Sequence, residues 1–303
     1  MKSDSVVLIG DRHSFSKLIR DLEKSTHVAV DTESNSFYAY FNRICLIQVS
    51  TEQWDYIIDP FSIGSIEALG KIFSNPEIEK IFHAASNDIS GLKRDFKFTV
   101  SNVFDTSIAA KMLGYKQLGL APILMEYFGV SLNKKWQRYD WGRRPLKGEQ
   151  IEYARFDTHF LIPLRHRLVA ELEEKELLAS AREAFEKVCV QEITEKHFSA
   201  GDFLHIYGAQ SLDAVGKRIL KALYLFREKE ARRRDRAPFR ILTNETLLRL
   251  ALHRPKSTQE LTRIKGIPRV YLTSRAAAPL LELIRKNEDQ EDEGLPVDKA
   301  KTQ

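Results

Sequence analysis

Short apolar runs separated by polar residues dominate the first 60 residues. Val28–Val30 leads into Asp31–Glu33, and Ile44–Val49 and Tyr56–Ile58 flank a polar turn at Ser50–Gln53. Runs of this length that are rich in β-branched residues are typical of strands. Because connections this short suit antiparallel neighbours, the pattern predicts a three-stranded meander.

The pattern then changes to an alternation of helices and strands. Ile66–Phe73 is helical in character, Lys80–His83 is strand-like, and Asn87–Phe96 is again helical. Alternation of this kind indicates parallel strands joined by crossover helices. A meander followed by such units predicts an α/β fold, a mixed sheet flanked by helices that resembles the ribonuclease H-like fold.

Helical patterns take over from about residue 150. We expect a long amphipathic helix at Gln150–Leu172, which Pro163 kinks or divides, and a charged helical continuation over Glu171–His197. A loop around Ser199–Ser211 follows. Beyond it, four segments separated by turns predict a small all-helical bundle: Leu212–Arg234, Asn244–Ala251, Thr258–Ile264 and Val270–Ile284.

The length of 303 residues exceeds that of a single core, so two domains are expected. We place the first at 1–205, a helical domain at 211–287 and an acidic disordered tail at 288–303. The net charge is −3 over residues 1–210, +12 over 211–286 and −4 over 287–303. A basic module beside an acidic one suggests a surface for a polyanion, and a solvated helical surface is the alternative.

Several classes of protein do not fit the composition. No apolar run is long enough for a signal peptide or a membrane span, so we expect no membrane partner. The two cysteines, Cys45 and Cys189, form neither a disulfide framework nor a metal-binding spacing, and a cytoplasmic location is predicted. The eight histidines are scattered without the spacing of a zinc site.

Two carboxylates at the end of a predicted strand are the first candidates for chemistry. Asp31 and Glu33 are two residues apart, so their side chains leave the strand on one face. The chain has no Lys or Arg between Lys24 and Arg43 to balance them. A hard divalent ion would relieve their repulsion, whereas the alternative is an ordinary acidic strand end.

Three further side chains are candidates with their own structural alternatives. Tyr153 and Asp157 have the i, i+4 spacing that places them on one helix face, where a phenol and a carboxylate can orient a water molecule. A core tyrosine and a surface aspartate would have the same spacing. Asp88 lies early in a predicted helix, where an acid also favours the helix dipole.

The order of these acids resembles the three motifs of the DEDD superfamily of 3′→5′ exonucleases. Asp31-Thr32-Glu33 resembles the first motif, His83–Asp88 the second, and Tyr153–Asp157 the form of the third that contains a tyrosine. The intervening text Cys45–Gln48, Asp105-Thr106 and Trp141–Leu146 agrees with the ribonuclease D family over about residues 20–175. Leu223–Arg227, Ala231, Arg234-Asp235 and Pro238 resemble a helicase-and-ribonuclease-D C-terminal (HRDC) domain.

The resemblance implies a catalytic role for Asp31, Glu33, Asp88, Tyr153 and Asp157, with the four acids as metal ligands. Two divalent ions, Mg²⁺ or Mn²⁺, would activate water and stabilise the leaving oxygen. Asp31 would bridge both ions, Glu33 and Asp157 would complete the nucleophile side, and Asp88 would hold the second ion. Tyr153 would position the attacking water.

Candidate substrate contacts come from basic side chains and one histidine. A stretch at 134–144 interleaves cations with aromatic residues, as in sites for single-stranded nucleic acid, and a run of arginines follows at 232–236. Core packing and solvation are the alternatives for both. The candidates are His83, Arg143, Arg144, Arg233 and Arg234.

The function implied is a metal-dependent 3′→5′ exoribonuclease that releases nucleoside 5′-monophosphates from single-stranded RNA 3′ ends, tRNA precursors among them. The best-known ribonuclease D architecture carries two HRDC modules and this chain has room for one, which leaves tRNA specificity open. An exonuclease for single-stranded DNA and a non-catalytic RNA-binding protein are the alternatives. All four acids and Tyr153 are present, which disfavours the second.

Overall fold

The computed structural model describes residues 6–190 and 198–289, and the chain divides into two compact units. Unit 1 comprises Met1–Phe37 and Asn42–Glu195, and unit 2 comprises Tyr38–Phe41 and Lys196–Gln303. Each unit has a hydrophobic core of its own. No helix in the part of the chain that the structure describes is both long and apolar enough to cross a membrane.

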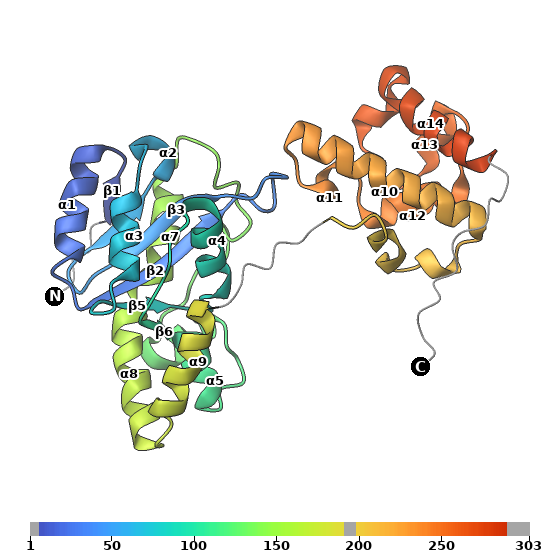
Figure 1. Cartoon of the computed structure of the whole chain (residues 1–303). Helices are drawn as coiled ribbons and strands as arrows, with labels where there is room; N and C mark the ends of the chain where they lie inside the picture. The colour runs from blue at the N-terminus through green and yellow to red at the C-terminus, as the bar shows by residue number, and fades with distance from the viewer. Residues whose placement is uncertain (1–5, 191–197, 290–303) are drawn as a thin grey trace. The chain divides into compact units, whose positions relative to one another are not determined.

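Unit 1 is built on a six-stranded mixed sheet (Figure 1). Its strands, in the order β1-β4-β3-β2-β5-β6 across the sheet, are β1 (Val6–Ile9), β4 (Asp55–Ile58), β3 (Ile44–Ser50), β2 (His27–Ser34), β5 (Glu79–Phe82) and β6 (Val103–Asp105). Strands β2, β3 and β4 form the expected antiparallel meander. Parallel pairing adds β1 to β4, β5 to β2, and β6 to β5, so the predicted α/β architecture is confirmed.

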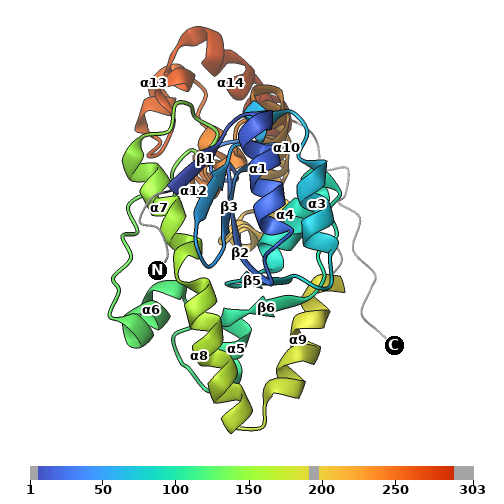
Figure 2. The same cartoon turned by 90° about the vertical axis from the view of Figure 1, so that its left-hand side faces the viewer.

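Helices cover both faces of this sheet. They are α1 (Arg12–Leu22), α2 (Pro60–Ile63), α3 (Glu67–Ser74), α4 (Ser86–Phe96), α5 (Thr106–Met112), α6 (Leu120–Phe128), α7 (Gly148–His159), α8 (Leu161–Glu174) and α9 (Leu178–Val190). Figure 2 shows α7 and α8 on one side of the sheet and α1, α3 and α4 on the other.

The alternation of side chains along β2 decides which face carries the acids. Val28 and Val30 pack into the core formed with α1, α3 and α4, whereas Ala29 packs into the core formed with α5 and α8. Because side chains alternate between faces, Asp31 and Glu33 share the face of Ala29. Helix α7 packs against β2, β3 and β4, and it lies on that face (Figure 2).

Several boundaries differ from the expectations. Strands β1 and β6 and helix α1 have no counterpart in the predicted elements, and β2 continues through both acids instead of ending before them. The long helix does divide near Pro163, because α7 ends at His159 and α8 begins at Leu161. Pro163 is the third residue of α8, where a backbone N–H has no intrahelical partner.

The charged helix expected over Glu171–His197 is not continuous. Helix α8 ends at Glu174, and Glu176 has a φ of 57°, which interrupts the helix before α9 begins at Leu178. Residues 191–197 of that prediction, and the predicted disordered tail from residue 290 on, lie outside the described residues. The helix expected at Val270–Ile284 begins four residues late, at Ser274, after a 3₁₀ turn.

Unit 2 is a bundle of helices, as predicted. Its elements are η1 (Asp202–His205), η2 (Ala209–Ser211), α10 (Ala214–Arg234), α11 (Pro238–Ile241), α12 (Asn244–His253), α13 (Thr258–Arg263), η3 (Arg269–Leu272) and α14 (Ser274–Glu288). Asp235 ends α10 in a left-handed conformation and accepts the backbone N–H groups of Tyr40 and Phe41 at 3.1 and 2.9 Å.

Candidate active site

Asp31 and Glu33 lie in the interior of β2 and are only partly exposed. In the antiparallel pair with β3, Asp31 is opposite Gln48 and Glu33 is opposite Leu46. Directly opposite side chains share one face of the sheet. Gln48 is fully buried, and neither polar atom of its amide has a hydrogen-bond partner among the described residues. An unsatisfied polar group thus lies beside Asp31.

Asp88 comes to the same strand from a neighbouring helix. It lies in the first turn of α4 and is buried, with 8% of its surface exposed. Its Oδ1 accepts the backbone N–H of Thr32 at 3.0 Å and the Thr32 hydroxyl at 2.6 Å. The residue between the two acids of the first motif therefore fixes the acid of the second.

Tyr153 and Asp157 are both on α7, as their spacing predicts. The Tyr153 ring stacks on the buried Trp141, with 5.9 Å between the ring centroids. This contact holds the phenol ring in place. Trp141 thus has a packing role, the alternative given for the aromatic residues of 134–144.

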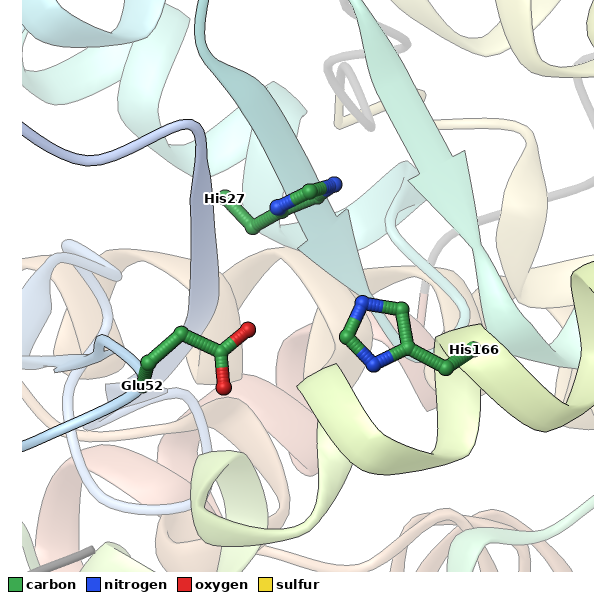
Figure 3. Close-up of side chains that lie close together, drawn as sticks. All are labelled: His27, Glu52 and His166. Carbon is green, nitrogen blue, oxygen red and sulfur yellow. The ribbon is translucent and has the colours of Figure 1, made fainter.

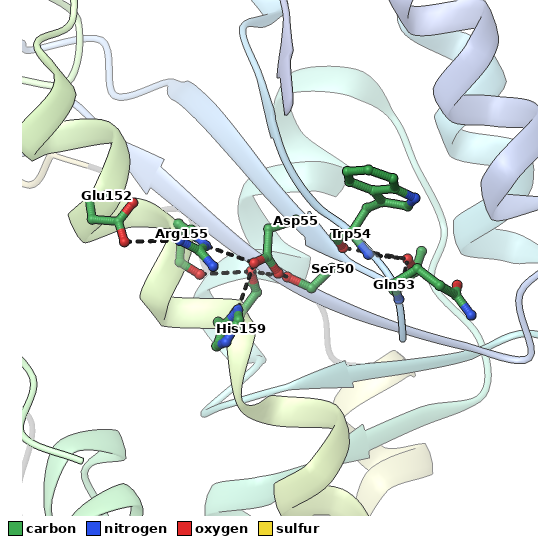
Figure 4. A network of polar contacts seen from close by, with 9 residues as sticks. Ser50, Gln53, Trp54, Asp55, Glu152, Arg155 and His159 are labelled. Atoms are coloured by element: carbon green, nitrogen blue, oxygen red, sulfur yellow. Dashed lines mark hydrogen bonds and ion pairs between the residues drawn. The ribbon is translucent and has the colours of Figure 1, made fainter. Parts of the chain in front are cut away.

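A buried polar network fastens α7 to the sheet (Figure 4). Asp55 on β4 is fully buried, and its Oδ2 accepts Arg155 Nε at 2.8 Å and lies 2.6 Å from His159 Nδ1. The Ser50 hydroxyl donates to Asp55 Oδ1 at 2.6 Å and lies 2.7 Å from the hydroxyl of Thr158. Asp157 lies between these anchored residues, so its position depends on them.

Burial and mutual repulsion shift the acids away from their ordinary ionisation. Burial, followed by the charges of Asp88, Asp157 and Glu33, raises the pKa of Asp31 well above its usual range. The pKa of Glu33 is raised by burial and by the charges of Asp157 and Asp88. Burial raises the pKa of Asp157 to about 7 and that of Asp88 to about 6.

The four acids fit a site for divalent cations. They offer only oxygen ligands, which select hard ions such as Mg²⁺ and Mn²⁺. Among the described residues, no ion pair joins any of them to a Lys or Arg. No three of their oxygens lie within 4.8 Å of one another in the described chain, so they do not converge on one point.

A pocket opens beside Tyr153 and Asp157. Its volume is about 340 Å³, within the usual range for small-molecule sites. Aromatic and apolar side chains accompany the polar ones along its wall, which includes Leu132, Trp136, Glu152, Tyr153, Phe156 and Asp157. An aromatic wall beside acids suits a nucleotide, whose base stacks while its phosphate meets a metal.

The proposed substrate contacts have varied surroundings. His83 is half-buried, its Nδ1 lies 2.9 Å from the Thr106 hydroxyl, and burial lowers its pKa. Arg144 is engaged within the protein, since its guanidinium contacts both Asp59 oxygens at 2.6 and 2.9 Å and donates to the Cys45 carbonyl. These contacts within unit 1 give Arg144 a structural role.

The remaining three candidates are arginines near the surface. Arg143 is exposed and pairs with Asp140 at 3.1 Å. In unit 2, Arg233 and Arg234 share Glu230, at 2.9 and 2.5 Å. Their predicted contact with RNA stays a prediction.

Two residues of the site were not among the sequence candidates. Gln48 lies in a segment that carries the family resemblance, and a signal for it exists, since it is a polar residue in an otherwise apolar strand. Asp55 is the first residue of a strand, and no feature of the sequence near it shows that it binds Arg155, 100 positions away.

Comparisons with known proteins match both parts of the chain to family models. A family model described as 3′-5′ exonuclease matches residues 6–173, and a model of the HRDC domain matches residues 216–284. "Protein RRP6-like 2" of Arabidopsis thaliana is 32% identical over 286 residues, which are 89% of this chain and 32% of that protein. Human "Exosome complex component 10" is 33% identical over 239 residues, 76% of this chain and 27% of that protein. The chain spans about a third of the length of these relatives.

Solved structures show the same architecture. The catalytic core of RRP6 from Trypanosoma brucei matches with a TM-score of 0.85 and 26% identity, covering 93% of this chain and 79% of that one. Escherichia coli RNase D, described as an exoribonuclease involved in structured RNA processing, matches with a TM-score of 0.72 and 27% identity over 97% and 78% of the two chains. The ribonuclease D resemblance and the ribonuclease H-like fold are confirmed, and divalent metal ions are normal for such exonucleases. This chain therefore belongs to the 3′-5′ exonuclease family and carries an HRDC domain that follows its exonuclease domain in the sequence.

Proposed function

We propose that this protein is a metal-dependent 3′→5′ exoribonuclease that shortens RNA from its 3′ end and releases nucleoside 5′-monophosphates. The observation that carries the proposal is that the charges of Asp88 and Asp157 raise the pKa of both Asp31 and Glu33, while Asp157 lines a pocket of about 340 Å³. The RNA processing named for E. coli RNase D supports RNA as the substrate.

Each side chain has a role that follows from its position. Asp31, Glu33, Asp88 and Asp157 would hold two ions, Mg²⁺ or Mn²⁺, which when bound supply a nucleophilic hydroxide and neutralise charge on the phosphate. Burial raises the pKa of Tyr153, with the charge of Asp157 as the next cause, so the phenol keeps its proton and can donate a hydrogen bond. Tyr153 is therefore suited to positioning the attacking water and not to removing its proton.

The natural substrates we favour are single-stranded 3′ ends of stable RNA, including tRNA precursors, with the HRDC domain adding affinity through its basic surface. Two free thiols, Cys45 and Cys189, suit a reducing cytoplasm.

The test uses matched RNA and DNA oligonucleotides labelled at the 5′ end, together with a circular RNA of the same sequence. With Mg²⁺ we expect a ladder that shortens from the 3′ end of the linear RNA, with 5′-monophosphates as the product. Chelation should abolish the reaction, and Asp31→Asn should reduce it to background. A faster reaction on DNA would replace the substrate class, and cleavage of the circle would rule out the exonuclease mechanism.

A further inference from the structure

Two histidines and a glutamate from three separate segments come together away from the acids (Figure 3). His27 begins β2, Glu52 follows the end of β3, and His166 is on α8. One potential ligand atom from each lies within 4.8 Å of the other two. Because the two histidines are far apart in the sequence, no local sequence spacing indicates this cluster.

The composition of the cluster defines the ion that it suits. Two imidazoles and one carboxylate form a common ligand set for Zn²⁺, which takes the nitrogen ligands that Mg²⁺ avoids. We propose that His27, Glu52 and His166 bind a divalent transition ion, Zn²⁺ in particular, with the fourth position open to water. Tetrahedral Zn²⁺ holds its ligands about 3.4 Å apart, given bonds of about 2.0–2.1 Å. Small side-chain rotations would close the cluster to that spacing.

The surroundings prepare His27 for this role. The Thr26 hydroxyl lies 2.9 Å from His27 Nδ1 and can orient the ring, as outer partners of metal-binding histidines do. Glu79 lies 3.8 Å from His27 Nε2, but Arg165 already engages both Glu79 oxygens, at 2.7 and 3.2 Å.

A simple packing contact explains the cluster less completely. The rings of His27 and His166 meet edge to face, with centroids 5.6 Å apart, which accounts for the two histidines. It does not account for the approach of the Glu52 carboxylate to both rings. A pocket of about 360 Å³ lined by His27, Glu52, Thr26 and Gln53 adjoins the cluster, so an ion and its water have room.

This site is distinct from the four acids in both place and chemistry. His27 is four residues before Asp31 on the same strand, about 13 Å along it at the usual rise. The acids offer only oxygen, whereas the cluster offers nitrogen as well. With Mg²⁺ in large excess, we expect Mg²⁺ at the acids and Zn²⁺ at the histidines. An ion bound here would tie the start of β2 to α8 and to the β3–β4 turn.

Titration of the full chain with Zn²⁺ by calorimetry, in a large excess of Mg²⁺, tests the proposal. We expect one Zn²⁺ per chain. His166→Ala should weaken binding at least about 10-fold, and Glu52→Gln should weaken it less. Both side chains are exposed, so neither change threatens folding. His13→Ala, which removes an exposed histidine from α1, is the matched control and should bind Zn²⁺ like the natural chain.

Two further measurements separate this site from the catalytic acids. Asp31→Asn should leave the Zn²⁺ stoichiometry and affinity unchanged while it abolishes nuclease activity. Zn²⁺ at about 100 times its Kd should raise the Tm by roughly 5–10 °C in the natural chain and not in His27→Ala/His166→Ala. Equal Zn²⁺ binding by that double variant and the natural chain, or loss of binding in Asp31→Asn, would overturn the proposal.

Discussion

At the scale of single residues, Asp157 and Asp88 titrate near neutral pH. Burial raises the pKa of Asp157 to about 7 and that of Asp88 to about 6. In the unfolded chain both would ionise near their ordinary value of 3.8. The folded state therefore binds more protons than the unfolded state between these values. The resulting loss of stability is complete above about pH 7 and disappears as the pH falls toward 3.8.

Metal-free protein should accordingly become more stable as the pH is lowered from about 8 to about 6. Saturating Mg²⁺ should remove this trend, since a cation offsets the same repulsion. Unit 1 holds Trp54, Trp136 and Trp141, which are all three tryptophans of the chain, so tryptophan fluorescence follows the melting of this unit. Asp157→Asn should flatten the metal-free pH dependence relative to the natural chain. An unchanged slope in that variant would mean that the repulsion lies elsewhere.

Substitutions of Tyr153 and Asp31 should impair activity in different ways. Asp31→Asn removes one of the charges proposed to hold the ions, so activity should fall to background and Mg²⁺ affinity should drop. Tyr153→Phe deletes one hydroxyl and keeps the stacking on Trp141, so the rate should fall on the order of 10²-fold with little change in Mg²⁺ affinity. Single-turnover kinetics across a Mg²⁺ titration distinguish these outcomes. If Tyr153→Phe kept the full rate of a limiting chemical step, Tyr153 would be a packing residue only.

At the scale of elements, the predicted meander is confirmed, whereas α1 is absent from the predictions although its buried residues Phe15, Leu18 and Leu22 have helical spacing. The meander follows from short apolar runs with short connections, and the helix carrying Tyr153 and Asp157 follows from the amphipathic pattern over Gln150–Leu172. Strand β6 has only three residues, Val103–Asp105, and pairs at the sheet edge with β5, so its sequence holds no period to detect. The helix break between α8 and α9 depends on a left-handed backbone conformation at Glu176, and a glutamate in the sequence does not indicate that conformation.

The sequence indicates the candidate acids of the site but not the residues that anchor α7 beside them. Asp31, Glu33 and Asp88 stand where strands end or helices begin in the sequence pattern, which is a local signal. The anchors of α7 are not local, because Asp55, Arg155 and His159 meet only when the sheet has formed.

Asp55→Asn tests that support. It removes the carboxylate that faces Arg155, whose side chain is buried, and deprives this cation of a buried ionic partner. The free energy of unfolding of unit 1 should fall by on the order of 3 kcal/mol, measured by urea denaturation and tryptophan fluorescence. The residual fold should also show reduced kcat, since α7 carries Tyr153 and Asp157.

Glu149→Gln, which breaks an exposed pair with Lys135, is the control for this experiment and should change stability little. An Asp55→Asn chain as stable as the control would contradict this role of the network.

At the scale of the whole molecule, charge is divided between the two units. Residues 211–286 carry a net charge of +12, and Arg232 and Arg236 near the end of α10 are exposed. The fold of unit 1 depends on neither side chain. Their contribution should therefore appear in RNA affinity and not in the chemical step.

Replacing both Arg232 and Arg236 with Gln should lower the slope of log Kd against log salt, by up to about 0.7 for each RNA phosphate that is no longer neutralised. The single-turnover rate at saturating RNA should stay unchanged. Arg20→Gln, an exposed change on α1, is the control for removing one positive charge from the other unit. A salt slope equal to that of the natural chain would mean that the basic surface serves another partner.

The burial of Cys45 at the centre of the sheet has a consequence for measuring motion. The side chain is fully buried in β3, and burial raises the pKa of its thiol to about 12, so it cannot react with an alkylating reagent until the strand opens. The chain has one other thiol, at Cys189, which Cys189→Ser removes. The labelling rate of Cys45 then measures how often the strand next to Asp31 opens transiently. Slower labelling of Cys45 in the presence of bound ions would show how strongly the ions stabilise the closed state of β3.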